Sequence, residues 1–333
     1  ANPTRSALET ALAALEGGGQ TFAFASGSAA TQAVLQTLRP GAHVLLSEDC
    51  YHGTRYQLLH LFAGWGIHTT QVDTTRLETV EAARRPETRL LWIESPSNPQ
   101  LRISDLDALS AWATDHGILS VRDNTVATPV LQRPLQHGID LVVHSTTKFL
   151  GGHGDLLGGA VIARPGLAAA DRLRQIQGAG GAVPSPFDCW LLLRSLRTLG
   201  VRVRRQAQTA ATLAQRLGEH PQVARVFHPL AADADDPERV RRYLPDGCGL
   251  LSFCVDGDQA QAMRTVAAAR LFTRATSLGS VESLIEHRAS IEGPESRTPE
   301  SLIRLSIGLE DAEDLWQDLD RALTPGRAEH ARE

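Results

Sequence analysis

Short apolar or β-branched segments alternate with amphipathic segments of helical period along most of the chain. Regular alternation of this kind favours a mostly parallel sheet that is covered by helices on both faces. The segments at 90–93 and 141–143 are apolar at every position, as expected of strands buried on both faces. We therefore predict an α/β fold, with strands at 43–48, 67–73, 89–95, 118–124, 140–146 and 158–163.

A long helical pattern at 186–217 leads to a smaller unit near the C-terminus. This unit is predicted to hold two strand–helix pairs, at 249–255 with 258–269 and at 302–307 with 311–323. The Ala-, Asp-, Pro- and Arg-rich segment at 230–245 is interpreted as a surface loop, and 324–333 as a frayed tail. Because 333 residues exceed the usual size of one domain, we predict a large domain over residues 1–215 and a small domain over residues 216–333.

The charge and the cysteines narrow the class of protein. The net charge of −5 contains no block of like charge, so there is no electrostatic reason to expect binding to nucleic acid or to a membrane. Because no apolar run reaches about 18 residues, we expect no transmembrane helix. The four cysteines form no Cys-x-x-Cys pair, so we expect neither a disulfide framework nor a metal site, and the reducing cytoplasm is the expected compartment.

The basic residues of the chain are almost all arginine. Of the 33 lysine and arginine residues, 32 are arginine and one is lysine, Lys148. Genomic base composition can replace lysine by arginine wherever a plain positive charge is enough, but it does not explain why one lysine remains. Only lysine can lose its proton near neutral pH and attack a carbonyl as a free amine, so Lys148 is predicted to be functional.

Ligands of α/β proteins bind at the carboxyl ends of the strands, and two features at such positions favour a cofactor. Residues 24–31 are small and lead into a helix, whose first N–H groups form a potential phosphate site, although many helices begin in this way. Asp123, in the Asp-Asn-Thr segment at 123–125, lies at the end of the strand at 118–124. Its carboxylate either holds a protonated pyridine nitrogen or caps the next turn.

Two more strand positions carry potential ligands. In the segment at 143–148, Ser145 and Thr147 offer hydroxyl groups to a phosphate beside Lys148, and the alternative is a solvated lysine next to a glycine turn. Arg304 interrupts the apolar strand at 302–307, where it binds a substrate carboxylate or forms a buried salt bridge. A reactive lysine, a phosphate site, an aspartate for a ring nitrogen and a carboxylate-binding arginine are together what pyridoxal phosphate (PLP) requires.

Ordered motifs along nearly the whole chain carry a family resemblance. They are Leu-Glu-Gly-Gly at 15–18, Ser-Pro-Ser-Asn-Pro at 95–99, Asp-Asn-Thr at 123–125, Val-His-Ser-Thr-Thr-Lys at 143–148, Ser-Leu-Gly-Ser-Val-Glu-Ser-Leu at 277–284 and Arg-Leu-Ser at 304–306. In these the sequence resembles the PLP-dependent Cys/Met metabolism enzymes, which include cystathionine γ-synthase, cystathionine γ-lyase, cystathionine β-lyase and methionine γ-lyase. The resemblance implies fold type I, with a mostly parallel seven-stranded sheet and a smaller C-terminal α/β domain.

The resemblance also assigns roles by position. Lys148 matches the lysine that forms an imine with PLP, and Asp123 matches the partner of the pyridine nitrogen. Tyr51 matches the tyrosine that stacks on the cofactor ring and assists proton transfer. The other matching cofactor and substrate positions are Gly27 and Ser28 (backbone to phosphate), Ser145 and Thr147 (hydroxyls to phosphate), Asn98 (near the phenolic oxygen), Ser277 and Arg304 (substrate carboxylate) and Glu282.

The implied activity is γ-replacement or γ-elimination on sulfur amino acids or activated homoserine, because the surroundings of Glu282 resemble those in γ-acting members. Methionine γ-lyase and cystathionine β-lyase activities remain alternatives. A Rossmann dehydrogenase is not supported, because the sequence has no G-x-G-x-x-G with an acidic residue about 20 positions later.

Three departures from the family pattern bear on these expectations. Ser28 stands where members usually have methionine, and His52 stands where they usually have glycine. A Tyr-x-Arg segment, which in the family reaches the phosphate of a neighbouring subunit, is not part of this sequence. The resemblance implies a homo-oligomer, a dimer of dimers. Without the Tyr-x-Arg segment we expect PLP to be held loosely, and a catalytically weak PLP-binding homologue is a further alternative.

Overall fold

The computed structural model describes residues 2–292 and 298–324 and divides the chain into two compact units. Unit 1 comprises Ala1–Asn98 and Arg102–Leu199, and unit 2 comprises Pro99–Leu101 and Gly200–Glu333. The domain boundary predicted at 215/216 falls within helix α9 (Leu199–Gly218). Of the predicted tail at 324–333, residues 325–333 lie outside the described residues.

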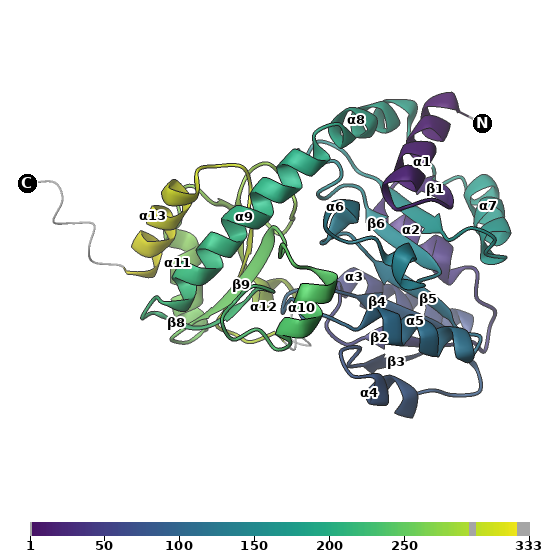
Figure 1. Cartoon of the computed structure of the whole chain (residues 1–333), viewed down its shortest axis with the longest axis horizontal. Helices are drawn as coiled ribbons and strands as arrows, with labels where there is room; N and C mark the ends of the chain where they lie inside the picture. Colours follow the sequence, from purple (N-terminus) through teal and green to yellow (C-terminus); the bar gives the residue numbers. More distant parts are fainter. Residues whose placement is uncertain (1, 293–297, 325–333) are drawn as a thin grey trace, which may run out of the picture. The chain divides into compact units, whose positions relative to one another are not determined.

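Unit 1 is built on a seven-stranded sheet in the order β1-β7-β6-β5-β4-β2-β3 (Figure 1). Its strands are β1 (Gln20–Phe24), β2 (His43–Ser47), β3 (His68–Val72), β4 (Thr88–Glu94), β5 (Leu119–Asp123), β6 (Leu141–Ser145) and β7 (Gly159–Ala163). The β2, β3, β4, β5 and β6 pairings are parallel, and β7 runs antiparallel to both of its neighbours. This confirms the predicted α/β fold with a mostly parallel sheet. β1 is a strand beyond those predicted from the sequence.

Helices lie between most consecutive strands of unit 1, and the last two helices both follow the last strand. The helices are α1 (Pro3–Leu15), α2 (Gly27–Leu35), α3 (His52–Tyr56), π-helix η1 (Gln57–Phe62), the 3-10 segment η2 (Ala63–Trp65), α4 (Leu77–Ala82), α5 (Leu106–Asp115), α6 (Thr128–Leu131), the 3-10 segment η3 (Pro134–His137), α7 (Ala169–Gly180) and α8 (Pro186–Leu196).

One face of the large sheet packs against α2. Val121 of β5, Val143 of β6 and Trp92 of β4 belong to the same buried cluster as Ala30 and Val34 of α2. Because side chains alternate along a strand, the residues two positions further on in these strands point to the same face. The last residues of β4, β5 and β6 therefore lie on the α2 side of the sheet.

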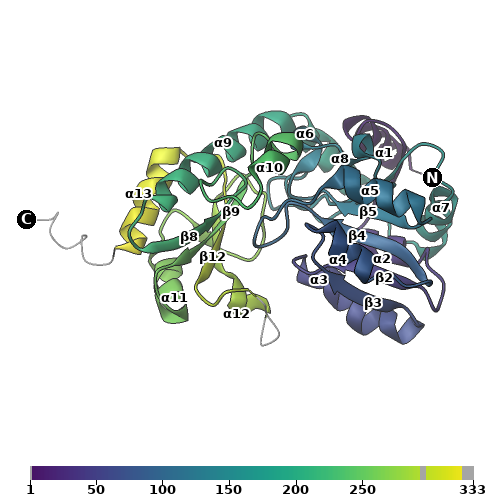
Figure 2. The same cartoon turned by 60° about the horizontal axis from the view of Figure 1, so that its bottom comes forward.

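Unit 2 contains a five-stranded sheet in the order β10-β11-β12-β9-β8 (Figure 2). Its strands are β8 (Val223–Phe227), β9 (Leu250–Val255), β10 (Thr273–Arg274), β11 (Leu284–His287) and β12 (Leu302–Ser306). Its other helices are α10 (Pro237–Tyr243), α11 (Gln259–Ala268), α12 (Arg288–Glu292) and α13 (Ala312–Leu323). Apolar side chains of α9, α11 and α13 form the core with the strands.

The prediction of a loop at 230–245 is wrong, because the segment contains α10. The Asp236 side chain accepts a hydrogen bond from the Arg239 N–H at 2.9 Å, and Pro237 occupies the first turn. An aspartate followed by proline is a common helix start, which outweighed the loop-like composition.

Membrane-spanning helices, metal-binding clusters and disulfides are absent from the described residues. None of the described helices is long and apolar enough to cross a bilayer. Within the described residues, no group of three or more His, Cys, Asp and Glu side chains could hold a metal ion. Cys50, Cys189, Cys248 and Cys254 are buried and are not joined in disulfides.

Candidate functional site

Two predicted site residues end adjacent strands of the large sheet. Asp123 is the last residue of β5 and Ser145 the last of β6, and the strand register pairs Asp123 with Val143. Both side chains point to the α2 side of the sheet and are half-buried. The Asp123 carboxylate accepts the Thr125 N–H at 3.0 Å, and the Thr125 hydroxyl accepts the Ser145 N–H at 2.9 Å. Hydrogen bonds thus link the ends of the two strands.

The N-terminus of α2 reaches Ser145. A Cβ placed on Gly27 would lie 2.7 Å from Cβ and 2.9 Å from Oγ of Ser145, so only glycine permits this approach. Ser26 caps the helix by accepting the Ala29 N–H at 3.1 Å, which leaves the N–H groups of Gly27 and Ser28 without an acceptor inside the helix. Backbone N–H groups and a hydroxyl at a helix N-terminus form a suitable anion site.

Lys148 follows β6 in a tight turn. Its backbone N–H donates to the Ser145 carbonyl at 3.2 Å, and its carbonyl accepts the Gly152 N–H at 2.7 Å. The residue is half-buried. Thr147, predicted to offer a hydroxyl to a phosphate, uses its Oγ1 on Gly158. It donates to the carbonyl at 3.2 Å and accepts the N–H at 3.1 Å.

Tyr51 and Asn98 follow β2 and β4, the strands next in the sheet. Tyr51 directly precedes α3, and its side chain is 40 % exposed. Asn98 is buried and lies four residues beyond the end of β4. The structure therefore brings Gly27, Ser145 and Asp123 together and places Tyr51, Asn98 and Lys148 in the loops at the carboxyl ends of the same parallel strands.

A buried charged cluster lies on the opposite face of β5 and β6, behind Asp123 and Ser145. Glu16 Oε1 contacts His144 Nε2 at 2.5 Å and accepts from Asn124 Nδ2 at 2.9 Å, and Arg122 donates to the side-chain oxygen Oδ1 of Asn124. Burial lowers the pKa of Arg122 to about 10, a value at which its guanidinium is still charged at neutral pH. The cluster could not be predicted from the sequence, because Glu16 is 128 positions from His144 and 108 positions from Asn124.

The predicted substrate-binding residues belong to unit 2 and are described within that unit. Arg304 of β12 is 2 % exposed, and it donates to the carbonyls of Thr276 at 2.8 Å and Ser277 at 3.2 Å. It also forms a buried ion pair with Glu286, so the salt bridge left open by the sequence is present. The Ser277 side chain is half-buried, and Glu282 is exposed.

Two further charged residues, Glu286 and Arg288, lie beside Arg304 and were not predicted from the sequence. Glu286 pairs with Arg304 and also with Arg288 at 3.3 Å, and Arg288 pairs in turn with Glu292 at 3.0 Å. Burial raises the pKa of Glu286, while the two arginines act against this shift. Glu286 and Arg304 form an ion pair because they lie directly opposite each other on β11 and β12. In the sequence, the apolar neighbours of both residues were the signal that could have indicated buried charges.

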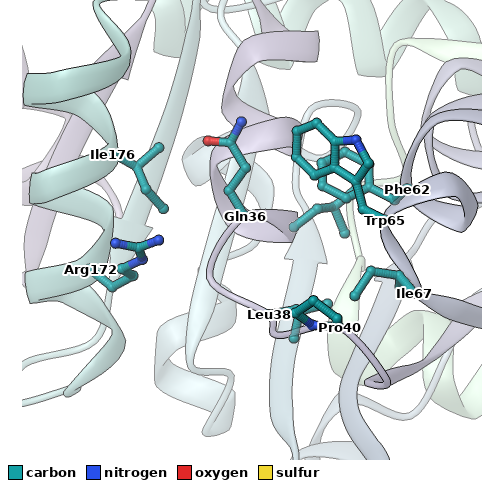
Figure 3. A pocket seen from close by; sticks show the side chains of 9 residues that line it. Gln36, Leu38, Pro40, Phe62, Trp65, Ile67, Arg172 and Ile176 are labelled. Carbon is teal, nitrogen blue, oxygen red and sulfur yellow. The ribbon is translucent and has the colours of Figure 1, made fainter.

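Each unit also contains a pocket that is lined by none of that unit's predicted site residues. One in unit 1, of about 330 Å³, is at the amino ends of β2 and β3, where Arg172 and Ile176 of α7 face Gln36 and Trp65 (Figure 3). One in unit 2, of about 770 Å³, lies between α9 and β8. Neither pocket contains a predicted site residue, so the candidate site remains the carboxyl edge of the large sheet.

The residues at this edge fit PLP. The α2 N-terminus and the Ser145 hydroxyl suit a phosphate, Asp123 offers a carboxylate for the ring nitrogen, and Lys148 supplies the amine. The missing Cβ of Gly27 is the observation that supports this fit, because any larger residue would separate α2 from Ser145.

Substitution of Gly27 by alanine is expected to weaken PLP binding by about tenfold or more, because the new methyl group must push Ser145 away from the helix N-terminus. The measurement is a titration of the cofactor-free protein with PLP, followed by absorbance. Gly178→Ala in α7 is the matched control, because nothing lies within 4 Å of its added Cβ. Equal affinities of the two variants would contradict the phosphate site.

Comparisons with known proteins agree with this geometry. A family model described as "Cys/Met metabolism PLP-dependent enzyme" matches residues 1–324. The chain is 42% identical over 328 residues to a cystathionine gamma-synthase of Mycobacterium tuberculosis, covering 97% of this chain and 84% of that protein. It is 41% identical over 332 residues to a cystathionine beta-lyase of Coxiella burnetii, covering 97% and 86%. The crystal structure of metB from Corynebacterium glutamicum superposes with a TM-score of 0.94 at 39% identity, covering 97% and 85%.

Proposed function

The chain belongs to the Cys/Met metabolism PLP-dependent enzyme family, and from this premise we propose that it catalyses γ-replacement or γ-elimination on sulfur amino acids or activated homoserine. The cofactor of the family is pyridoxal 5'-phosphate. The observation that carries the proposal is the convergence of the α2 N-terminus, Ser145 and Asp123 at the sheet edge that leads to the only lysine.

The cofactor, when bound, supplies an electron sink for the negative charge that develops at the substrate α-carbon. Gly27 and Ser28 would bind its phosphate through backbone N–H groups, with the Ser145 hydroxyl beside them. Asp123 would hold the proton on the ring nitrogen, which strengthens the electron sink.

Lys148 is assigned the proton transfers. As a free amine it would take the proton from the substrate α-carbon and deliver protons to neighbouring atoms of the substrate. Tyr51 would assist this transfer through its phenol and orient the ring through stacking. The Tyr51 side chain, in the loop after β2, is 40 % exposed, so a bound ligand could cover its ring.

Substrate recognition is assigned to unit 2. Arg304 would bind the substrate carboxylate together with Ser277, whose carbonyl it already contacts. Asn98 and Glu282 are the other proposed substrate contacts. The Ser-Leu-Gly-Ser-Val-Glu-Ser-Leu segment that carries Glu282 resembles that of the γ-acting members of the family, and this resemblance supports γ- rather than β-chemistry.

We also propose that the chain assembles as a dimer of dimers in the cytoplasm. Large apolar side chains are exposed on α8, where Phe187 is 66% and Trp190 52% exposed, and between α3 and η2, where Tyr56 is 57% and Trp65 61% exposed. Exposed apolar groups of this size are typical of subunit interfaces. The four buried thiols support a reducing compartment.

The proposed activity predicts specific products from the PLP-loaded enzyme. O-Succinyl-L-homoserine with L-cysteine should give cystathionine and succinate, and cystathionine alone should give cysteine, 2-oxobutanoate and ammonia if elimination dominates. Product identification by mass spectrometry, with the PLP-loaded Lys148→Ala protein as the control, distinguishes the two reactions.

Other products would identify the alternatives. Homocysteine and pyruvate from cystathionine would indicate β-lyase activity, and methanethiol from methionine would indicate methionine γ-lyase activity. Bound cofactor with no turnover of any of these substrates would contradict the proposal and support a non-catalytic PLP-binding protein.

A further inference from the structure

A buried carboxylate of the neighbouring strand holds the backbone of Tyr51. Glu94, the last residue of β4, is 5 % exposed, and its Oε2 accepts the Tyr51 N–H at 2.8 Å. The Glu94 N–H donates to Ser47 Oγ at 3.2 Å, and Ser47 is the last residue of β2. Glu94 therefore holds the loop between β2 and α3 at two points, at Ser47 where the loop begins and at Tyr51 where it ends.

The ring of Tyr51 lies against a glycine. A Cβ on Gly53 would be 2.4 Å from Cε1 and 3.0 Å from the phenolic oxygen of Tyr51, so the ring occupies the space that a side chain at residue 53 would need. The His52 ring contacts Tyr51 edge-on, with 4.8 Å between the ring centroids. Both contacts come from the first turn of α3.

The contacts with Glu94 and Gly53 determine the orientation of the Tyr51 ring, because the ring is not packed in the protein core. The Tyr51 side chain is 40 % exposed, and an exposed aromatic side chain ordinarily samples more than one rotamer. Glu94 fixes the position of the Tyr51 backbone, and the bare face of Gly53 determines where the ring rests. The acidic group also lies at the start of α3, where a negative charge is favourable.

We propose that Glu94 and Gly53 are positioning residues for Tyr51, which hold its ring and phenol in the orientation needed over the cofactor. The proposal rests on the proposed function, in which Tyr51 contacts the cofactor. It assigns no contact between Glu94 or Gly53 and the substrate. Their effect on the reaction should therefore pass entirely through Tyr51.

The experiment compares single and double variants of the PLP-loaded full chain, with cystathionine or with O-succinyl-L-homoserine and cysteine. Glu94→Ala removes the acceptor, and Gly53→Ala displaces the ring. Each should lower kcat about tenfold with a smaller change in KM, and each should alter the circular dichroism of the cofactor absorption band. Glu94→Gln keeps an acceptor oxygen and should retain kcat to within about threefold.

The matched control is Gly64→Ala, in the 3-10 segment of the same helical region, where nothing lies within 4 Å of the added Cβ. This variant should keep wild-type kcat and dichroism. In a Tyr51→Ala background, Glu94→Ala and Gly53→Ala should have no further effect, because the side chain through which they act is gone.

Equal losses of kcat in the wild-type and Tyr51→Ala backgrounds would overturn the proposal, because the residues would then act independently of Tyr51. Wild-type kcat and dichroism of Gly53→Ala would overturn it as well, and this variant decides the matter if Glu94→Ala does not fold. Unchanged turnover of Tyr51→Ala itself would instead contradict the role of Tyr51 in the proposed function. The two failures are thus distinguishable.

Discussion

Replacement of Lys148 by arginine is expected to abolish turnover, with kcat falling on the order of 10⁴-fold or more. Arginine keeps the positive charge and a similar reach, but its guanidinium stays protonated and can neither form an imine nor accept a proton from carbon. No other lysine of the sequence can take over this role, because Lys148 is the only one. Turnover and the visible absorbance of the protein after addition of PLP are the measurements.

Borohydride reduction gives an independent test of the same assignment. In the unsubstituted protein it should leave a pyridoxyl group on the peptide that contains Lys148, detectable by peptide mass analysis. Lys148→Arg should carry no such group at this peptide. An active preparation whose Lys148 peptide stays unmodified after reduction would show that the lysine does not hold the cofactor.

The features that could be predicted from the sequence are those that depend on residue type at a strand end. Lys148 and Asp123 each follow a short apolar segment, and their positions at one edge follow from the parallel order of the strands. Capping preferences of single residues were less reliable for predicting where a helix begins. α5 begins after Asp105, which accepts the Ala108 N–H at 3.0 Å. The helical pattern at 104–116 predicts Ser104 as the cap, and this prediction is wrong, because the Ser104 hydroxyl contacts the Thr74 hydroxyl at 3.0 Å instead.

The features that could not be predicted are partnerships between distant side chains. Glu94 is one of many carboxylates in the sequence, and its contact with Tyr51 joins residues 43 positions apart. Glu16 and His144 are 128 positions apart and meet in the core. Such pairs depend on the register of neighbouring strands and on the path of loops. Hydrophobic periodicity predicts neither of these.

The sequence also left the role of Arg304 open between a substrate carboxylate and a buried salt bridge. The structure contains the salt bridge, with Glu286 directly opposite on β11. This pair does not replace the carboxylate role, because a guanidinium carries five N–H donors and a paired arginine is held in a defined orientation. The carboxylate role stays a prediction.

Asp123→Asn is expected to lower kcat by about 10² to 10³-fold while leaving the fold intact. The substitution removes the negative charge that would keep the ring nitrogen protonated, so the electron sink is weakened at the moment when charge develops at the substrate α-carbon. The amide oxygen of asparagine can still accept the Thr125 N–H, which Asp123 now accepts at 3.0 Å. The measurements are kcat, and the thermal unfolding midpoint of the cofactor-free protein.

The comparison of these two measurements separates the two roles that the sequence left open for Asp123. If the carboxylate only caps the turn, asparagine should replace it without loss, since asparagine and aspartate are comparable acceptors for backbone N–H groups. Asp105→Asn at the start of α5 is the matched control, because there the carboxylate caps a helix and turnover should not change. Wild-type kcat in Asp123→Asn would therefore reduce Asp123 to a cap, whereas a large loss of kcat at an unchanged unfolding midpoint assigns its charge to the reaction.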